Sequence, residues 1–131
     1  MNKTFTKILI VDDNEDVLIA AKLLLKPLAG MVVIEKNPQM IPQLLLNESY
    51  DIIFLDMNFT QDMTSGQEGF YWLNEILKID PAAVVILITA FASVSSAIQA
   101  LKDGAYDYVT KPVDPDELAH LVKKGLEQKS L

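Results

Sequence analysis

Short apolar runs alternate with amphipathic, helix-type patterns along the whole chain. The runs at residues 8–11 and 52–55 are branched and continuous, as in strands that are buried on both faces. The complete pattern predicts strands over residues 8–11, 31–35, 51–56, 83–89 and 106–110, and helices over residues 15–25, 38–47, 69–79, 93–103 and 114–128. This alternation predicts an α/β fold with a parallel sheet, right-handed crossovers and helices on both faces.

Local signals mark several element ends. Asn14 is a suitable cap for the first helix, and Gly104 is expected to end the fourth. The first helix carries an apolar stripe, which predicts its buried face: Val17, Leu18, Ala21, Leu24, Leu25 and Leu28. Residues 58–68 are polar and fit no element, and a loop of this length in a compact α/β unit is more often functional than not.

Length and composition exclude several classes of protein. The 131 residues are about one domain, and no shift in composition suggests a second, so we expect a single domain over residues 1–131. The absence of cysteine excludes thiol catalysis and cysteine metal sites and is natural in a reducing cytoplasm. A net charge of −7 disfavours nucleic acid and anionic membranes as direct partners, and no apolar run approaches the ~20 residues of a membrane span.

Acidic residues close two of the predicted strands. Asp12 and Asp13 follow the run at residues 8–11, and Asp56 closes the run at residues 52–55. An Asp-Asp pair after one strand is more often a helix cap with a solvated neighbour, but the strand ends of a parallel sheet meet at one edge, where ligands bind. Carboxylates crowded at that edge repel one another, so a bound divalent cation explains their presence. We therefore predict a Mg²⁺ site made by Asp12, Asp13 and Asp56.

Phosphoryl chemistry fits the other polar residues at this edge. The Asp56 carboxylate, held beside a cation, is a candidate nucleophile for a phosphoryl group. The backbone carbonyl of Asn58 is placed to supply a further metal ligand. Thr89 ends the fourth predicted strand and Lys111 follows the fifth, so a hydroxyl and an ammonium group are available as donors to that phosphoryl group.

These residues carry a resemblance to the receiver domains of bacterial two-component response regulators, over roughly residues 7–127. The matching segments are Leu9-Ile10-Val11-Asp12-Asp13, Ile53-Phe54-Leu55-Asp56-Met57, Ile88-Thr89-Ala90, Gly104-Ala105 and Tyr108-Val109-Thr110-Lys111-Pro112. The loop after Asp56 departs from the usual pattern, which is shorter and carries a proline. With Gly69-Phe70-Tyr71-Trp72-Leu73, this longer loop resembles the receivers of NtrC-like activators of sigma-54-dependent transcription.

The resemblance implies a flavodoxin-like, CheY-like sheet of five strands in the order 2-1-3-4-5 with five helices. It implies phosphorylation of Asp56 by a sensor histidine kinase, with Thr89 and Tyr108 as a switch pair. The fourth helix, fifth strand and fifth helix would then control homodimerisation or binding of an output partner. It also implies C-terminal AAA+ and DNA-binding domains, which lie outside these 131 residues, and a signalling role limited to self-catalysed phosphotransfer and autodephosphorylation.

Three alternatives stay open from the residues. Asp56-Met57-Asn58-Phe59-Thr60 nearly reproduces the Asp-x-Asp-x-Thr signature of haloacid-dehalogenase-like phosphatases, but an amide at position 58 cannot act as the general acid. A flavodoxin-like cofactor binder needs a phosphate loop after the first strand, where the acidic segment 12–16 repels phosphate. A receiver-like interaction module that is never phosphorylated is disfavoured by the intact acidic set. The sequence position of Tyr108 also fits an ordinary aromatic residue of the core, and that of His120 fits a surface residue.

Overall fold

The computed structural model describes residues 6–57, 67–90, 94–111 and 113–130. Its centre is a parallel sheet whose strands stand in the order β2-β1-β3-β4-β5. The strands are β1 (Lys7–Val11), β2 (Met31–Glu35), β3 (Ile52–Asp56), β4 (Val85–Thr89) and β5 (Asp107–Thr110). The predicted α/β class and the strand order implied by the resemblance are both confirmed.

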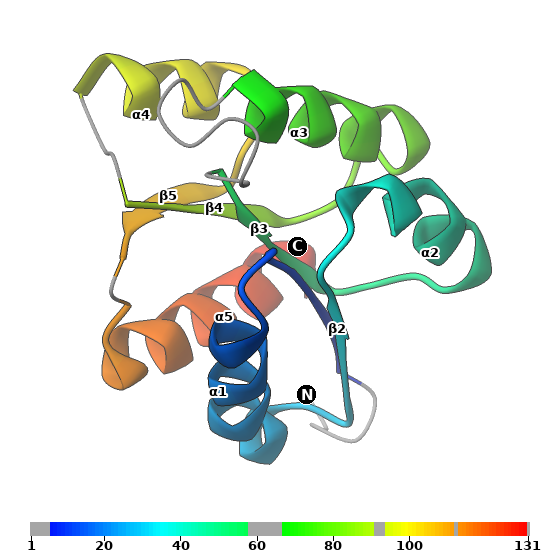
Figure 1. Ribbon diagram of the computed structural model, residues 1–131, viewed down its shortest axis with the longest axis vertical. Coiled ribbons are helices and arrows are strands. Elements are labelled where there is room, and N and C mark those ends of the chain that lie inside the picture. The colour runs from blue at the N-terminus through cyan, green and yellow to red at the C-terminus, as the bar shows by residue number, and fades with distance from the viewer. Residues whose placement is uncertain (1–5, 58–66, 91–93, 112, 131) are drawn as a thin grey trace.

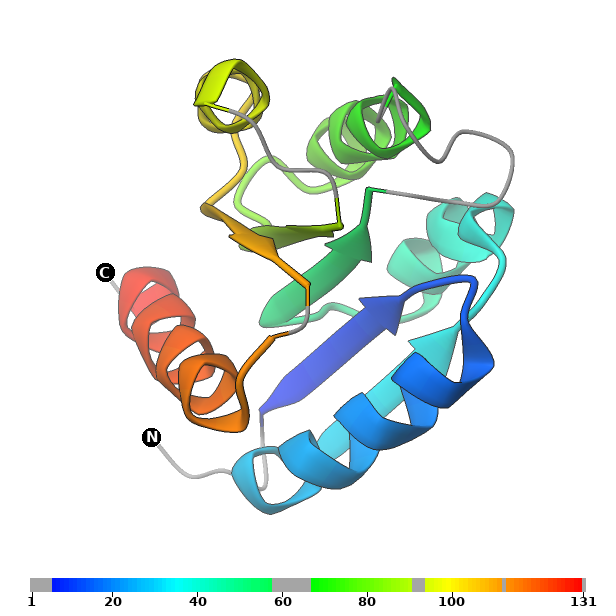
Figure 2. The ribbon, with the colours of Figure 1, turned by 60° about the vertical axis from the view of Figure 1, so that its left-hand side comes forward.

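Helices cover both faces of this sheet. They are α1 (Glu15–Leu25), α2 (Ile41–Asn47), α3 (Gln67–Ile79), α4 (Val94–Lys102) and α5 (Pro115–Ser130), with 3₁₀ turns η2 (Lys26–Leu28) and η3 (Pro38–Met40). Helices α1 and α5 lie on one face, and α2, α3 and α4 lie on the other (Figures 1 and 2). Among the described helices, none has the length and apolar character needed to cross a membrane.

Each face of the sheet has its own apolar core, because successive side chains of a strand point to opposite faces. In β3, Ile53 and Leu55 contribute to the core under α2, α3 and α4, while Ile52 and Phe54 contribute to the core under α1 and α5. All four side chains are at most 1% exposed. Trp72 belongs to the first of these cores and Phe70 packs half-buried against it, while His120 is exposed as expected.

Several predicted boundaries are wrong for local reasons. The helix predicted over residues 38–47 is split into η3 and α2, because Pro42 has no N–H and is tolerated only in the first turn of an α-helix. Strand β4 begins at Val85 instead of residue 83, since the Ala83 N–H still donates to the Asp80 carbonyl in a turn (3.0 Å). Helix α3 begins at Gln67, two residues before its predicted start.

The predicted buried stripe of α1 is only partly correct. Leu18 and Leu25 are buried, whereas Val17 and Leu24 are 36% and 43% exposed. Asn14 caps the helix as predicted, and its side-chain oxygen accepts hydrogen bonds from the backbone N–H groups of Asp16 and Val17. Gly104 has φ = 106° after α4, a left-handed conformation that suits glycine at a helix end.

Candidate functional site

Asp12 is fixed at the end of β1 by its own backbone and side chain. Its N–H donates to the Glu35 carbonyl of β2 (3.1 Å), which continues the pairing of the two strands by one residue. Its carboxylate oxygen Oδ1 accepts a hydrogen bond from the Asn14 N–H (2.9 Å). Because Asn14 also caps α1, the turn between strand and helix holds this carboxylate at the sheet edge, where it is 3% exposed.

Asp56 is the last residue of β3, which lies between β1 and β4 at the centre of the sheet. Its register partner in β4 is Ile88, and the N–H of the next residue, Met57, donates to the Ile88 carbonyl (2.8 Å). The residue is 1% exposed, and its oxygen Oδ2 is fully buried. The sheet therefore holds the backbone on both sides of this carboxylate.

The structure brings the three predicted acidic residues together. One carboxylate oxygen from each of Asp12, Asp13 and Asp56 lies within 4.8 Å of the others, with Asp13 half-buried and the other two buried. Hard cations such as Mg²⁺ prefer carboxylate oxygens and keep several water molecules, so three carboxylates at one strand edge suit such an ion. The donor set therefore fits the predicted metal.

Lys111 supplies the positive charge of the site. It directly follows β5, and its N–H donates to the Thr89 carbonyl of β4 (2.7 Å). Its Nζ atom lies 3.0 Å from Asp56 Oδ1 and 3.1 Å from Asp12 Oδ2. Burial lowers the pKa of Lys111, but the hydrogen bonds and charges of Asp56 and Asp12 outweigh it and leave the pKa above its ordinary value of 10.5. The ammonium group thus stays charged and joins two strand ends.

For the other predicted site residues, the structure gives burial and strand register or does not describe the residue. Thr89 is 2% exposed at the end of β4, one residue beyond the register partner of Asp56. Tyr108 faces Leu87 in the register of β4 and β5 and packs, half-buried, against the core under α2, α3 and α4. Asn58 lies outside the described residues, as does Pro112 of the Lys-Pro pair.

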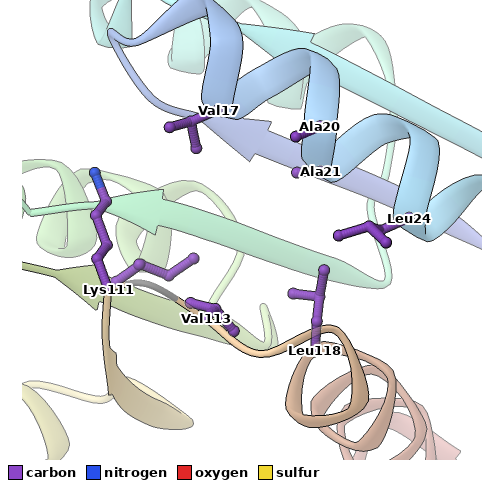
Figure 3. Close-up of a pocket in the computed structure, with 8 residues that line it drawn as sticks. Val17, Ala20, Ala21, Leu24, Lys111, Val113 and Leu118 are labelled. Carbon is purple, nitrogen blue, oxygen red and sulfur yellow. The ribbon is translucent and has the colours of Figure 1, made fainter.

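An apolar hollow of about 510 Å³ opens beside the site between α1 and α5. Lys111 is its charged lining residue, and Figure 3 shows that side chain rising from the end of β5 across from Val17 of α1. The full lining is Val17, Ala20, Ala21, Leu24, Ile88, Lys111, Val113 and Leu118. The sequence analysis missed this hollow because it assigned Val17, Ala21 and Leu24 to the buried face of the helix. The small side chain of Ala20, next to Ala21, was the available signal.

Together, a doubly wound sheet with acidic residues at the ends of β1 and β3 and a lysine after β5 defines a domain suited to metal-assisted phosphoryl chemistry at its carboxyl edge. Comparison with known proteins identifies the family to which such a domain belongs. The sequence matches the response regulator receiver domain family over residues 8–123, and the chain belongs to that family. Receiver domains are signalling domains, so the resemblance found in the sequence is confirmed.

Two curated relatives illustrate the similarity. Transcriptional regulatory protein ZraR of Escherichia coli K12 is 30% identical over 119 residues, which cover 91% of this chain and 26% of ZraR. Response regulator protein PilR of Pseudomonas aeruginosa is 35% identical over 124 residues, which cover 92% of this chain and 26% of PilR. The chain thus spans about a quarter of the length of these relatives, and both support the predicted likeness to receivers of NtrC-like activators.

Solved structures agree with this assignment. A CheY-like receiver domain from Methanospirillum hungatei has a TM-score of 0.85 at 26% identity, covering 96% of this chain and 97% of the other. A receiver domain from Clostridium thermocellum has a TM-score of 0.84 at 29% identity, covering 96% and 98%. The haloacid-dehalogenase alternative receives no support from these likenesses.

Proposed function

We propose that residues 7–127 act as one receiver domain in which Asp56 accepts a phosphoryl group from a sensor histidine kinase. The observation that carries this proposal is the position of Lys111 Nζ, 3.0 Å from Asp56 and 3.1 Å from Asp12. A buried carboxylate beside a second carboxylate and an ammonium group has the charges that phosphoryl transfer needs at its acceptor.

In this proposal, Asp12, Asp13 and Asp56 hold Mg²⁺ together with the Asn58 carbonyl. When bound there, the ion would offset the negative charge of the transferring oxygens. A carboxylate oxygen of Asp56 attacks phosphorus while the bond from phosphorus to the kinase's imidazole nitrogen breaks. Lys111 and the Thr89 hydroxyl then donate hydrogen bonds to the phosphoryl oxygens. Beyond this transfer and the hydrolysis of the acyl phosphate, we propose no enzymatic activity.

The output side of the proposal concerns α4, β5 and α5. Phosphorylation draws Thr89 toward Asp56 and shifts Tyr108, which changes the surface of these elements and favours a homodimer or an output partner. Exposed apolar side chains on α4, namely Ile98 and Leu101, support such an interface. Relatives such as ZraR support a place at the front of an NtrC-like activator with AAA+ and DNA-binding domains. A cytoplasmic location is part of the same proposal.

A phosphodonor assay tests the acceptor. We expect acetyl phosphate with Mg²⁺ to add one phosphoryl group to the wild-type chain, measured by intact mass, and none to Asp56→Asn. The matched control is Asp16→Asn, which makes the same acid-to-amide change at an exposed position of α1. Labelling of Asp56→Asn at the wild-type level would contradict the assignment. Loss of labelling in Asp16→Asn would show that labelling depends on the net charge of the chain and not on Asp56 itself.

A further inference from the structure

Gly69 occupies a helical position where glycine is unfavourable. It is the third residue of α3, and glycine has a lower helix propensity than alanine because it loses more backbone freedom on folding. It is also buried. A steric reason for glycine is visible at this point. A Cβ atom built at Gly69 would lie 2.8 Å from the backbone Cα of Met57, and it would also collide with the Met57 sulfur. The first turn of α3 therefore touches the chain directly after the phosphoacceptor strand.

Met57 cannot easily move away from α3. Its side chain is 2% exposed and belongs to the core under α2, α3 and α4. On the other side, its N–H donates to the Ile88 carbonyl of β4 at 2.8 Å. The residue is thus held between α3 and β4. Any shift of its backbone passes through one peptide bond to Asp56, whose carboxylate lies 3.0 Å from Lys111 Nζ.

We propose that Gly69 is a positioning residue of the phosphoacceptor site. The missing side chain lets α3 pack against the backbone of residue 57, and this packing fixes the orientation of the Asp56 carboxylate toward the metal ligands and Lys111. The inference rests on the proposed function of Asp56 and adds a residue that touches neither metal nor phosphoryl group. Its action is geometric, so its loss should slow transfer in molecules that remain folded.

The test compares Gly69→Ala with Gly125→Ala. Gly125 is a buried glycine of α5, and the three atoms nearest to a Cβ there all belong to side chains, the closest being Ile52 Cδ1 at 3.0 Å. Labelling by acetyl phosphate is followed by intact mass over a Mg²⁺ titration, with the folded fraction taken from far-UV circular dichroism. We expect Gly69→Ala to lower the maximal labelling rate at saturating Mg²⁺ by about tenfold or more, since displacement of a reacting group by about 1 Å is costly. Gly125→Ala should label at the wild-type rate.

A second pair of variants separates backbone from side chain and covers poor folding of the single variant. Met57→Ala removes the sulfur that collides with a Cβ at position 69, but the backbone of residue 57 would still lie 2.8 Å from that Cβ. The double variant with Gly69→Ala and Met57→Ala should therefore fold more readily than Gly69→Ala alone. It should still label more slowly than Met57→Ala alone. Equal rates in these two proteins would overturn the inference, and so would a Gly69→Ala rate per folded molecule equal to wild type. No labelling of the wild type would instead contradict the proposed function of Asp56.

Discussion

At the scale of single residues, Lys111 stabilises the candidate site in the unphosphorylated protein by pairing with its carboxylates. Its ammonium group pairs with carboxylates from two strands, and its side chain is 25% exposed. We expect Lys111→Met to lower the free energy of unfolding of the metal-free protein by about 2 kcal/mol, between the values for exposed and buried ion pairs. Urea unfolding at neutral pH measures this change. A variant as stable as wild type would mean that water already screens the pair.

The same residue gives a pH dependence with a defined sign. The raised pKa of Lys111 means that its stabilising contribution is fully present below pH 10.5 and is lost as the pH rises through the folded-state value. Burial also raises the pKa of Tyr50 above 10.0, and the hydrogen bond with Glu48 raises the pKa of Lys7. The loss of the Lys111 contribution is therefore one of three reasons why wild-type stability falls in the alkaline range. The difference between wild type and Lys111→Met should stay constant at neutral pH and shrink only in this alkaline range. A difference that shrinks near neutral pH would contradict the linkage.

Asp13 offers a separate test of the acidic cluster. Its carboxylate lies within 4.8 Å of those of Asp12 and Asp56. Removing one negative charge relieves repulsion, so Asp13→Asn should raise the free energy of unfolding of the metal-free protein by up to about 1 kcal/mol. The same change should weaken the stabilisation gained from added Mg²⁺. Urea unfolding with and without excess Mg²⁺ checks both effects. A variant that gains as much stability as wild type from Mg²⁺ would place the ion elsewhere.

At the scale of elements, the sequence predicted what depends on local pattern and missed what depends on neighbours. The bounds of α1 and β2 were predicted correctly, because caps and apolar runs are local signals. The start of β4 was not, since the turn at Asp80 extends into residues that also have strand-like composition. Strand ends likewise predicted the acidic cluster and Lys111. The packing of Gly69 against Met57 and the ion pair of Lys111 with Asp12 depend on tertiary structure that no spacing reveals.

Two adjacent leucines of α1 show how packing divides a predicted stripe. Leu25 is fully buried in the core under α1 and α5, and Leu24 is 43% exposed at the hollow. We expect Leu25→Ala to lower the free energy of unfolding by about 2–5 kcal/mol, because it leaves a cavity. Leu24→Ala should cost less than about 1 kcal/mol, as for other exposed positions. Equal losses in urea unfolding would indicate that Leu24 is covered in solution.

At the scale of the whole molecule, the proposed output surface predicts a change in association. Beryllofluoride with Mg²⁺ should mimic the phosphoryl group and increase self-association in sedimentation equilibrium. Leu101→Ser should reduce that increase without changing stability, because Leu101 is 53% exposed on α4 and contributes little to the core. Leu46→Ser, at a residue 78% exposed on α2, is the matched control on another surface. Identical association of the Leu101→Ser and control proteins would show that the α4 surface at Leu101 does not form the interface.

The division of the interior into two cores also decides what a fluorescence experiment can report. Trp72, the single tryptophan of the chain, is 8% exposed in the core under α2, α3 and α4, and its ring meets that of Tyr71 edge to face. Tryptophan emission therefore follows loss of that core alone, whereas far-UV circular dichroism follows helices on both faces. Coincident denaturation curves from the two signals would show that the cores melt as one cooperative unit. Separated curves would show that the sheet can lose one layer of helices while it keeps the other.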